Sequence, residues 1–165
     1  MNEIIEKLSS YNIFNYLFPG IVFIVFLEQV TSYKVPTTQI FENAFLYYFV
    51  GLILSRISSL IIEPFLKWTK FVKFAPYKDY VQMSQQDKTL ETLSEANNMY
   101  RSMISVFFVL VVCKAYELLS FKIGFFEKYA VEILTVSLFT LFIFSYKKQT
   151  AYIRKRVEAN KEKTP

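Results

Sequence analysis

Residues 43–66 read NAFLYYFVGLILSRISSLIIEPFL, a run whose only charged residues are Arg56 and Glu63. A helix needs about 20 residues to cross the hydrocarbon layer of a bilayer, which is about 30 Å thick. Further apolar stretches of comparable length occupy residues 12–31, 101–121 and 129–146. The sequence therefore predicts an all-α, polytopic membrane protein with four transmembrane helices in a single domain, 1–165.

Lysine and arginine are distributed unevenly around the four predicted spans. Most of them lie in the connection 67–100 and in the tail 147–165, whereas the other two connections hold only Lys34, Lys122 and Lys128. Cytoplasmic segments retain positive charge, and short translocated loops carry little of it. We therefore expect a multi-pass membrane protein with both termini in the cytoplasm and the first span retained as an anchor.

The composition argues against an enzyme. The sequence has no histidine and one cysteine, Cys113, so the commonest general base is absent and no cysteine cluster can form within the chain. It also lacks a glycine-rich phosphate loop and a G-x-S-x-G elbow. We expect no catalytic residues, no metal site and no cofactor.

The cytoplasmic connection contains helix signals of its own. Pro64 and Pro76 restrict the backbone, so the second helix is expected to end or bend between them. Ser84 or Asp87 can cap a new helix, and apolar residues then recur at three- and four-residue steps toward the third span. We expect the third helix to start in the cytoplasm and to run unbroken over about 88–120.

Charged residues inside the spans are the candidate pore or gating residues, because charge at membrane depth is costly and usually faces a bundle interior or water. Arg56 is the foremost candidate. Gly51, Ser55 and Ser59 form a stripe of small residues at steps of four, which favours either a close helix contact or a pore lining. Arg56 either recurs around an oligomer axis, or it pairs with Glu63 or with an acid of a neighbouring helix and fixes the packing.

The outer halves of the spans carry a second set of candidates. Lys114 and Glu117 are three residues apart and can pair on one helix face. Glu28 and Glu132 reach a similar depth, so a cluster with Lys114 is expected, and an acidic rim would favour cations. The alternative is that both glutamates extend into interfacial water.

The basic residues near the predicted cytoplasmic face allow two interpretations. They form either a solvated face that sets the topology or a binding surface for a polyanion such as a nucleotide or an oligonucleotide. The candidates for an anionic ligand or a soluble partner protein are Lys67, Lys70, Lys73, Lys78, Arg101, Arg154, Lys155 and Arg156.

A single bundle of four helices encloses no roomy pore, because side chains fill its middle. A channel therefore requires a homo-oligomer, and we favour a tetramer in the lipid bilayer. The first hypothesis is an oligomeric channel or pore-forming effector gated from the cytoplasm. The second is a non-conducting sensor or anchor that recruits a soluble partner. The third is a small proton-coupled transporter that uses Glu28 or Glu132.

The run SRISSLIIEPFLKWTKFVKFAPYKDY at 55–80 and the run SEANNMYRSM at 94–103 resemble small four-span bacterial membrane proteins. In size, span number and basic face, the whole chain resembles membrane subunits of anti-phage defence systems, the Hailong type first and the Kiwa type second. The Hailong resemblance implies an oligomeric ion channel that a nucleic-acid-like product of a partner nucleotidyltransferase holds closed, and that depolarises the cell when it is released.

Overall fold

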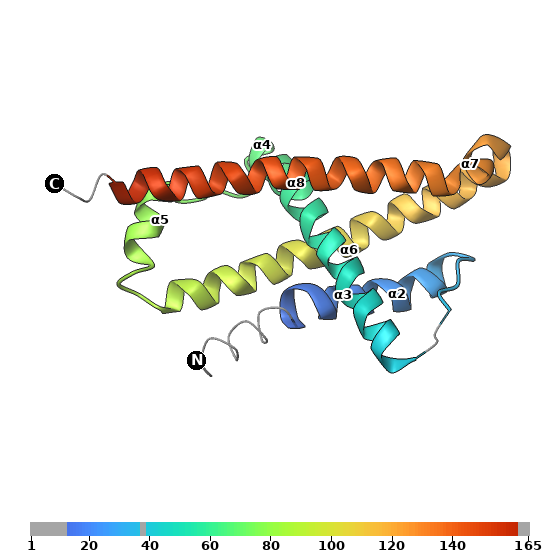
Figure 1. The fold of residues 1–165 in the computed structure, drawn as a ribbon, viewed down its shortest axis with the longest axis horizontal. Helices are drawn as coiled ribbons and strands as arrows, with labels where there is room; N and C mark the ends of the chain where they lie inside the picture. The colour runs from blue at the N-terminus through green and yellow to red at the C-terminus, as the bar shows by residue number, and fades with distance from the viewer. Residues whose placement is uncertain (1–12, 37–38, 162–165) are drawn as a thin grey trace.

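The computed structural model describes residues 13–36 and 39–161, and all regular structure within these ranges is helical (Figure 1). Two short segments, labelled η, have π-helical hydrogen bonding. In chain order the elements are η1 (Ile13–Leu17), α2 (Phe18–Val30), α3 (Ile40–Ile57), η2 (Ser58–Ile62), α4 (Glu63–Trp68), α5 (Tyr77–Met83), α6 (Thr89–Lys122), α7 (Gly124–Lys128) and α8 (Ala130–Lys161).

Three helices are long and apolar enough to cross a membrane: the continuous run 40–68, α6, and α8 over 130–160. The first predicted span is a shorter apolar helix over 15–30, and Asn12 lies outside the described residues. The prediction of an all-α chain is confirmed. The unbroken third helix is also confirmed, because α6 has 34 residues and is therefore about 50 Å long. Four spans and an oligomer stay predictions.

The packed core is formed by α2, α3 and α6. Its buried apolar side chains come from these three helices only and are Phe23, Ile24, Leu27, Leu54, Val106 and Leu110. Two glycines let the backbones approach closely. A Cβ atom added to Gly20 would lie 1.8 Å from the carbonyl oxygen of Tyr47, and one added to Gly51 would lie 1.7 Å from that of Tyr16.

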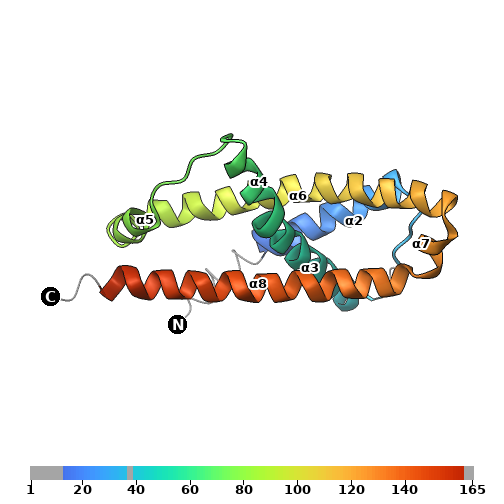
Figure 2. The ribbon, with the colours of Figure 1, turned by 90° about the horizontal axis from the view of Figure 1, so that it is seen from above.

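Helix α8 lies apart from this core (Figure 2). In that view α3 crosses between α8 and α6. No apolar side chain over 130–147 of α8 is buried. Large side chains such as Val131, Leu134 and Phe139 are each more than half exposed. Exposed apolar surface on this scale needs lipid or another chain to cover it.

The connections gather at two ends of the molecule (Figure 1). One end, here the α5 end, carries α5, the start of α6 and the end of α8. The opposite end, the α7 end, carries α7 and the connection between α2 and α3. Both basic segments of the sequence, the connection 67–100 and the tail 147–161, therefore extend toward the same end, although the connection begins at α4, near the middle of α8.

Two prolines lie inside helical runs, and each follows a π-helical segment. Pro19 is the second residue of α2, directly after η1, and Pro64 is the second residue of α4, directly after η2. Proline has no backbone N–H and leaves a carbonyl of the preceding turn without its donor. A local shift to π geometry keeps the chain helical through both positions.

We call the continuous run 40–68, which comprises α3, η2 and α4, the second helical run. It ends where the prolines predict, between Pro64 and Pro76. After Trp68 the chain closes with Phe71 N–H donating to the carbonyl of Leu66 and Lys70 N–H donating to that of Lys67, both at 3.0 Å. Lys70 takes a left-handed conformation with φ of 59°. This pattern is a Schellman motif, with lysine at the position that glycine usually occupies.

Candidate functional site

The kink at Pro64 creates the first feature of the site, a free carbonyl oxygen. The N–H of Glu63 donates to the carbonyl of Ser58, so the helix is in π register here. In that register the next donor, for the carbonyl of Ser59, would be residue 64, which is proline. The ammonium group of Lys148 on α8 donates to the Ser59 carbonyl instead. Because Pro64 has no N–H, the carbonyl of Ser59 is left to accept the hydrogen bond that joins α8 to the second helical run.

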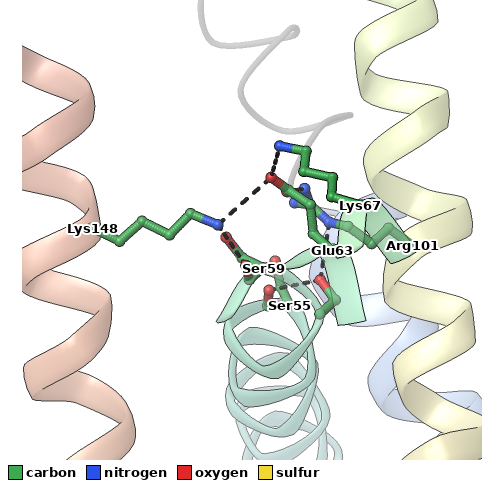
Figure 3. Close-up of polar contacts among 7 residues, drawn as sticks. Ser55, Ser59, Glu63, Lys67, Arg101 and Lys148 are labelled. Atoms are coloured by element: carbon green, nitrogen blue, oxygen red, sulfur yellow. Dashed lines mark hydrogen bonds and ion pairs between the residues drawn. The ribbon is translucent and has the colours of Figure 1, made fainter. Parts of the chain in front are cut away.

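Glu63 lies beside this carbonyl and forms ion pairs with cations from three helices (Figure 3). Its Oε1 atom is 2.7 Å from Nζ of Lys67 and 3.8 Å from Nζ of Lys148, and its Oε2 atom pairs with the guanidinium of Arg101. Arg101 also donates from Nε to Oγ of Ser58 at 3.3 Å. We call Glu63, Lys67, Arg101 and Lys148 the Glu63 cluster.

The Glu63 cluster is unbalanced in charge. The carboxylate is 6% exposed, and the side chains of Arg101 and Lys148 are 18% and 24% exposed. A buried carboxylate is stable only when paired, and Glu63 pairs with three cations. Three cations share one carboxylate, so the cluster has positive charge left over for another anion.

A cavity of about 510 Å³ opens beside the Glu63 cluster, between α4, α5, α6 and α8. We call it the ligand cavity. Lys67, Arg101 and Lys155 supply its three positive charges, and Glu63 supplies its one negative charge. Its aromatic rings are Phe74, Tyr77, Tyr80 and Tyr152. Further polar lining comes from Ser94, Asn97 and Asn98.

The rings and cations of the ligand cavity already contact one another. Tyr77 on α5 and Tyr152 on α8 have ring centroids 6.3 Å apart, and Nζ of Lys67 lies 4.1 Å from the ring centroid of Phe74. Flat rings beside cations suit a ligand that has both a ring and negative charge. The volume is within the range of small-molecule sites.

Of the predicted basic candidates, the structure brings Lys67, Arg101 and Lys155 to the ligand cavity. The other predicted candidates do not line it. These are Lys70, Lys73, Lys78, Arg154 and Arg156.

Among the predicted small residues, Gly51 makes a helix contact, because the backbone of Tyr16 lies against it. Ser55 accepts a hydrogen bond at its carbonyl from Oγ of Ser58. Ser59 and Arg56 line a separate small cavity that faces α8. The expected pairing of Arg56 with Glu63 is not formed, since the partners of Glu63 among the described residues are Lys67, Arg101 and Lys148.

At the α7 end, Glu117 joins α6 to the connection after α2. Its Oε1 atom accepts the N–H of Ser32 at 2.6 Å, and its Oε2 atom pairs with Lys114, as the spacing predicted, also at 2.6 Å. Here one cation balances one carboxylate. The contact fixes the connection against α6 and leaves no charge over.

The expected cluster of Glu28, Glu132 and Lys114 is not formed as ion pairs within 13–36 and 39–161. Glu28 accepts the N–H of Val35 at 3.0 Å and so holds the connection after α2. Glu132 is exposed, beside a mostly apolar groove on α7 and α8. This geometry gives no support to a shared acidic rim or to a proton-exchange site.

Sequence reasoning missed Lys148, Tyr152 and Ser58 as site residues. Lys148 belongs to the basic tail, and its charge alone does not separate it from Lys147 beside it. The available signal was Pro64, whose missing N–H requires a donor from elsewhere. No residue spacing reveals which helix supplies that donor.

No family model, curated protein or solved structure matches this chain. Among the described residues, no group of three or more acidic, cysteine or histidine side chains is placed to hold a metal ion. The site must therefore be interpreted from its own chemistry, which is that of cations and aromatic rings around one shared carboxylate.

Proposed function

We propose that this chain is a bacterial inner-membrane protein that assembles into a homo-oligomeric ion channel, gated from the cytoplasm by an anionic ligand in the ligand cavity. The observation that carries the proposal is the Glu63 cluster. It lies beside that cavity and connects the second helical run, α6 and α8 through one carboxylate. A ligand that competes for these cations acts on all three helices at once.

The proposed topology has four spans, with the α5 end in the cytoplasm. The distribution of lysine and arginine supports this orientation, and so does the placement of both basic segments toward the same end of the molecule (Figure 1). The first span, 13–30, is the shortest. At 1.5 Å per residue it covers about 27 Å, close to the thickness of the hydrocarbon layer.

The proposed gating step is an exchange of anions. Arg101 and Lys67 contact Glu63 and also line the ligand cavity. A ligand anion bound to them weakens their hold on Glu63 and leaves that carboxylate to Lys148. The α8 contact is then stronger with ligand than without it. A ligand shifts such an equilibrium only by its difference in affinity for the two states, and this exchange supplies that difference.

A nucleotide or a short oligonucleotide is the ligand class that we propose. Lys67, Arg101 and Lys155 can bind phosphate oxygens, for which arginine offers paired donors. Tyr77 and Tyr152 offer faces on which a base can stack. Charge alone would admit any anion, and the aromatic lining favours one that carries a ring.

The proposed oligomer, with a tetramer favoured, follows from the exposed surface of α8. The apolar stretch of this helix is unburied in one chain, and one chain of this size encloses no pore. Contacts between copies and lipid would cover the stretch together. The resemblance to defence-system membrane subunits adds the proposal that the channel is an effector of anti-phage defence.

The direct test is ion flux from proteoliposomes that contain the purified full-length protein. We expect flux to change when nucleotides or short oligonucleotides are added on the side that the tail faces, and Arg101→Gln to weaken this response by at least about tenfold. Lys147→Gln removes the same charge from an exposed position of α8 and serves as the matched control.

Two results would contradict the proposal. A protein that stays monomeric in lipid and conducts under no condition is not a channel. An Arg101→Gln variant with the same ligand response as Lys147→Gln would place the ligand elsewhere.

The second candidate is a membrane sensor or anchor that does not conduct and recruits a soluble partner. The exposure of the basic tail favours it. The side chain of Arg154 is 74% exposed, and within 13–36 and 39–161 its ion pair is with Glu158, four residues later. If this candidate is right, replacing Arg154 and Arg156 by glutamine would abolish recruitment. The charged residues of the spans would have no role in it. In the channel, the same change would leave flux intact.

A further inference from the structure

A second and much smaller cavity lies between the second helical run and α8. Its volume is about 20 Å³, and its lining includes Arg56, Ser59, Ser145, Lys148, Gln149 and Tyr152. We call it the small cavity. A space of this size holds about one water-sized particle. It is therefore far too small for a nucleotide.

The small cavity is cationic on both of its walls. Arg56 comes from α3 and Lys148 from α8. Among residues 13–36 and 39–161, no carboxylate forms an ion pair with Arg56. The nearest carboxylate to Lys148 is Glu63, at 3.8 Å, and it already pairs with Lys67 and Arg101.

The local charge balance therefore lacks anions. Lys67, Arg101 and Lys148 share the single carboxylate of Glu63, and Arg56 adds a further cation at the small cavity. Arginine stays protonated in proteins, so Arg56 cannot shed its charge. Unpaired charge in a partly buried, low-dielectric setting is costly. A bound anion would offset that cost.

The hydrogen-bond donors of the lining also suit an anion. The guanidinium of Arg56 carries five N–H donors, and the amide of Gln149 and the hydroxyl of Tyr152 add more. The Ser145 hydroxyl donates to the carbonyl of Leu141 at 2.8 Å and so contributes no donor. Residues that carry donors thus line both walls of a space for a single small particle.

We propose that the small cavity binds one monoatomic anion, of which chloride is the abundant cellular example, held between Arg56 and Lys148. The size of the cavity excludes polyatomic oxyanions such as phosphate or sulfate. The anion would join α3 to α8 next to the bond between Lys148 and Ser59. This site is a separate space from the ligand cavity, although Tyr152 lines both, and the proposal does not depend on whether the protein conducts ions.

The test is the thermal stability of the purified full-length protein in detergent, in sodium salts at constant ionic strength. Chloride and bromide should raise Tm with a saturable dependence on concentration, as expected for a ligand of the folded state. Gluconate and sulfate should give no saturable rise in Tm. Arg56→Gln should lose the halide response, and Arg56→Lys should keep part of it.

Lys147→Gln is the matched control, because it removes a neighbouring exposed cation that does not line the small cavity. It should keep the full halide response. Equal stabilisation by all four salts would show charge screening only, and would overturn the proposal. A full halide response in Arg56→Gln would also overturn it.

A second measurement decides the matter if Arg56→Gln fails to fold. Chloride-35 resonance line width, recorded with wild-type protein, should increase on addition of protein and narrow again when bromide displaces chloride. Lys148→Gln should reduce the broadening. The absence of protein-dependent broadening in the wild type would refute the site, and displacement by sulfate as efficient as that by bromide would refute its monoatomic character.

Discussion

The second helical run makes two very different contacts, one with the first helix and one with α8. Against the first helix the contact is backbone on backbone, at Gly20 and Gly51. Against α8 it depends on polar side chains, chiefly Lys148 with the Ser59 carbonyl and with Glu63. Close packing has one good arrangement, whereas a shared carboxylate can exchange partners. The difference identifies α2, α3 and α6 as the scaffold and α8 as the part suited to move.

The largest effect should come from breaking the packed contact. In Gly51→Ala the added Cβ would lie 1.7 Å from the Tyr16 carbonyl oxygen, and backbone atoms cannot give way as a flexible side chain can. We expect a loss of about 3 kcal/mol or more in unfolding free energy, measured by denaturation in mixed micelles.

Gly124→Ala is the control for this change, because nothing lies within 4 Å of a Cβ atom there. It should leave stability nearly unchanged. Alanine favours a helix more than glycine does, so helix propensity cannot cause a loss. Similar losses in both variants would mean that the close approach of the two helices is unimportant.

Glu63→Gln breaks the ionic contact and should have the second-largest effect. The variant leaves Arg101 and Lys148 partly buried without a carboxylate, which should cost about 2 to 3 kcal/mol. Hydrogen exchange should rise in α8 over 147–160 and stay unchanged in α2. Glu158→Gln, at an exposed i,i+4 pair, should have no comparable effect.

If the amide hydrogens of α2 exchange as fast as those of α8 in Glu63→Gln, the scaffold and α8 unfold together. The division of the molecule into a packed part and a separable helix would then be wrong.

Glu117→Gln sharpens the comparison at the α7 end. The glutamine oxygen can still accept the N–H of Ser32, and the cation left behind, Lys114, is 43% exposed and can reach water. We expect a fall in Tm less than half of that for Glu63→Gln. A larger fall than for Glu63→Gln would show that the balanced pair matters more than the cluster with excess charge.

The smallest effect concerns Asp87, before α6. Its carboxylate accepts the N–H of Thr89 at 2.8 Å, and hydrogen bonds from Thr89 lower the pKa of Asp87 below its ordinary value of 3.8. Its stabilisation of the helix start is therefore complete above that value and is lost as pH falls through the lower folded pKa.

Asp87→Asn keeps an acceptor and should remove this pH dependence. Hydrogen exchange of residues 89–92, compared between acidic and neutral pH, checks it. An equal pH dependence in the wild type and in Asp87→Asn would assign the effect to another group.

The sequence predicted the helices well because their signals are local. Apolar runs, Pro64 with Pro76, and Asp87 located the second and third helices within a few residues. The pair Lys114 and Glu117 was also predictable, since three residues span one face. The partners of Glu63 were not, because they depend on which helices cross at its level. Sequence spacing suggested Arg56 as the partner of Glu63, but in the folded chain Arg101 and Lys148 pair with it.

The two π-helical segments have the same relation to proline: each ends two residues before one, at Pro19 and at Pro64. Successive residues of a helix project about 100° apart around its axis, so the sequence position of a proline determines the direction in which the released carbonyl points. At Pro64 that direction is toward α8. Pro64, whose side chain has no polar atom, thus determines which neighbouring helix can supply a cation to the released carbonyl.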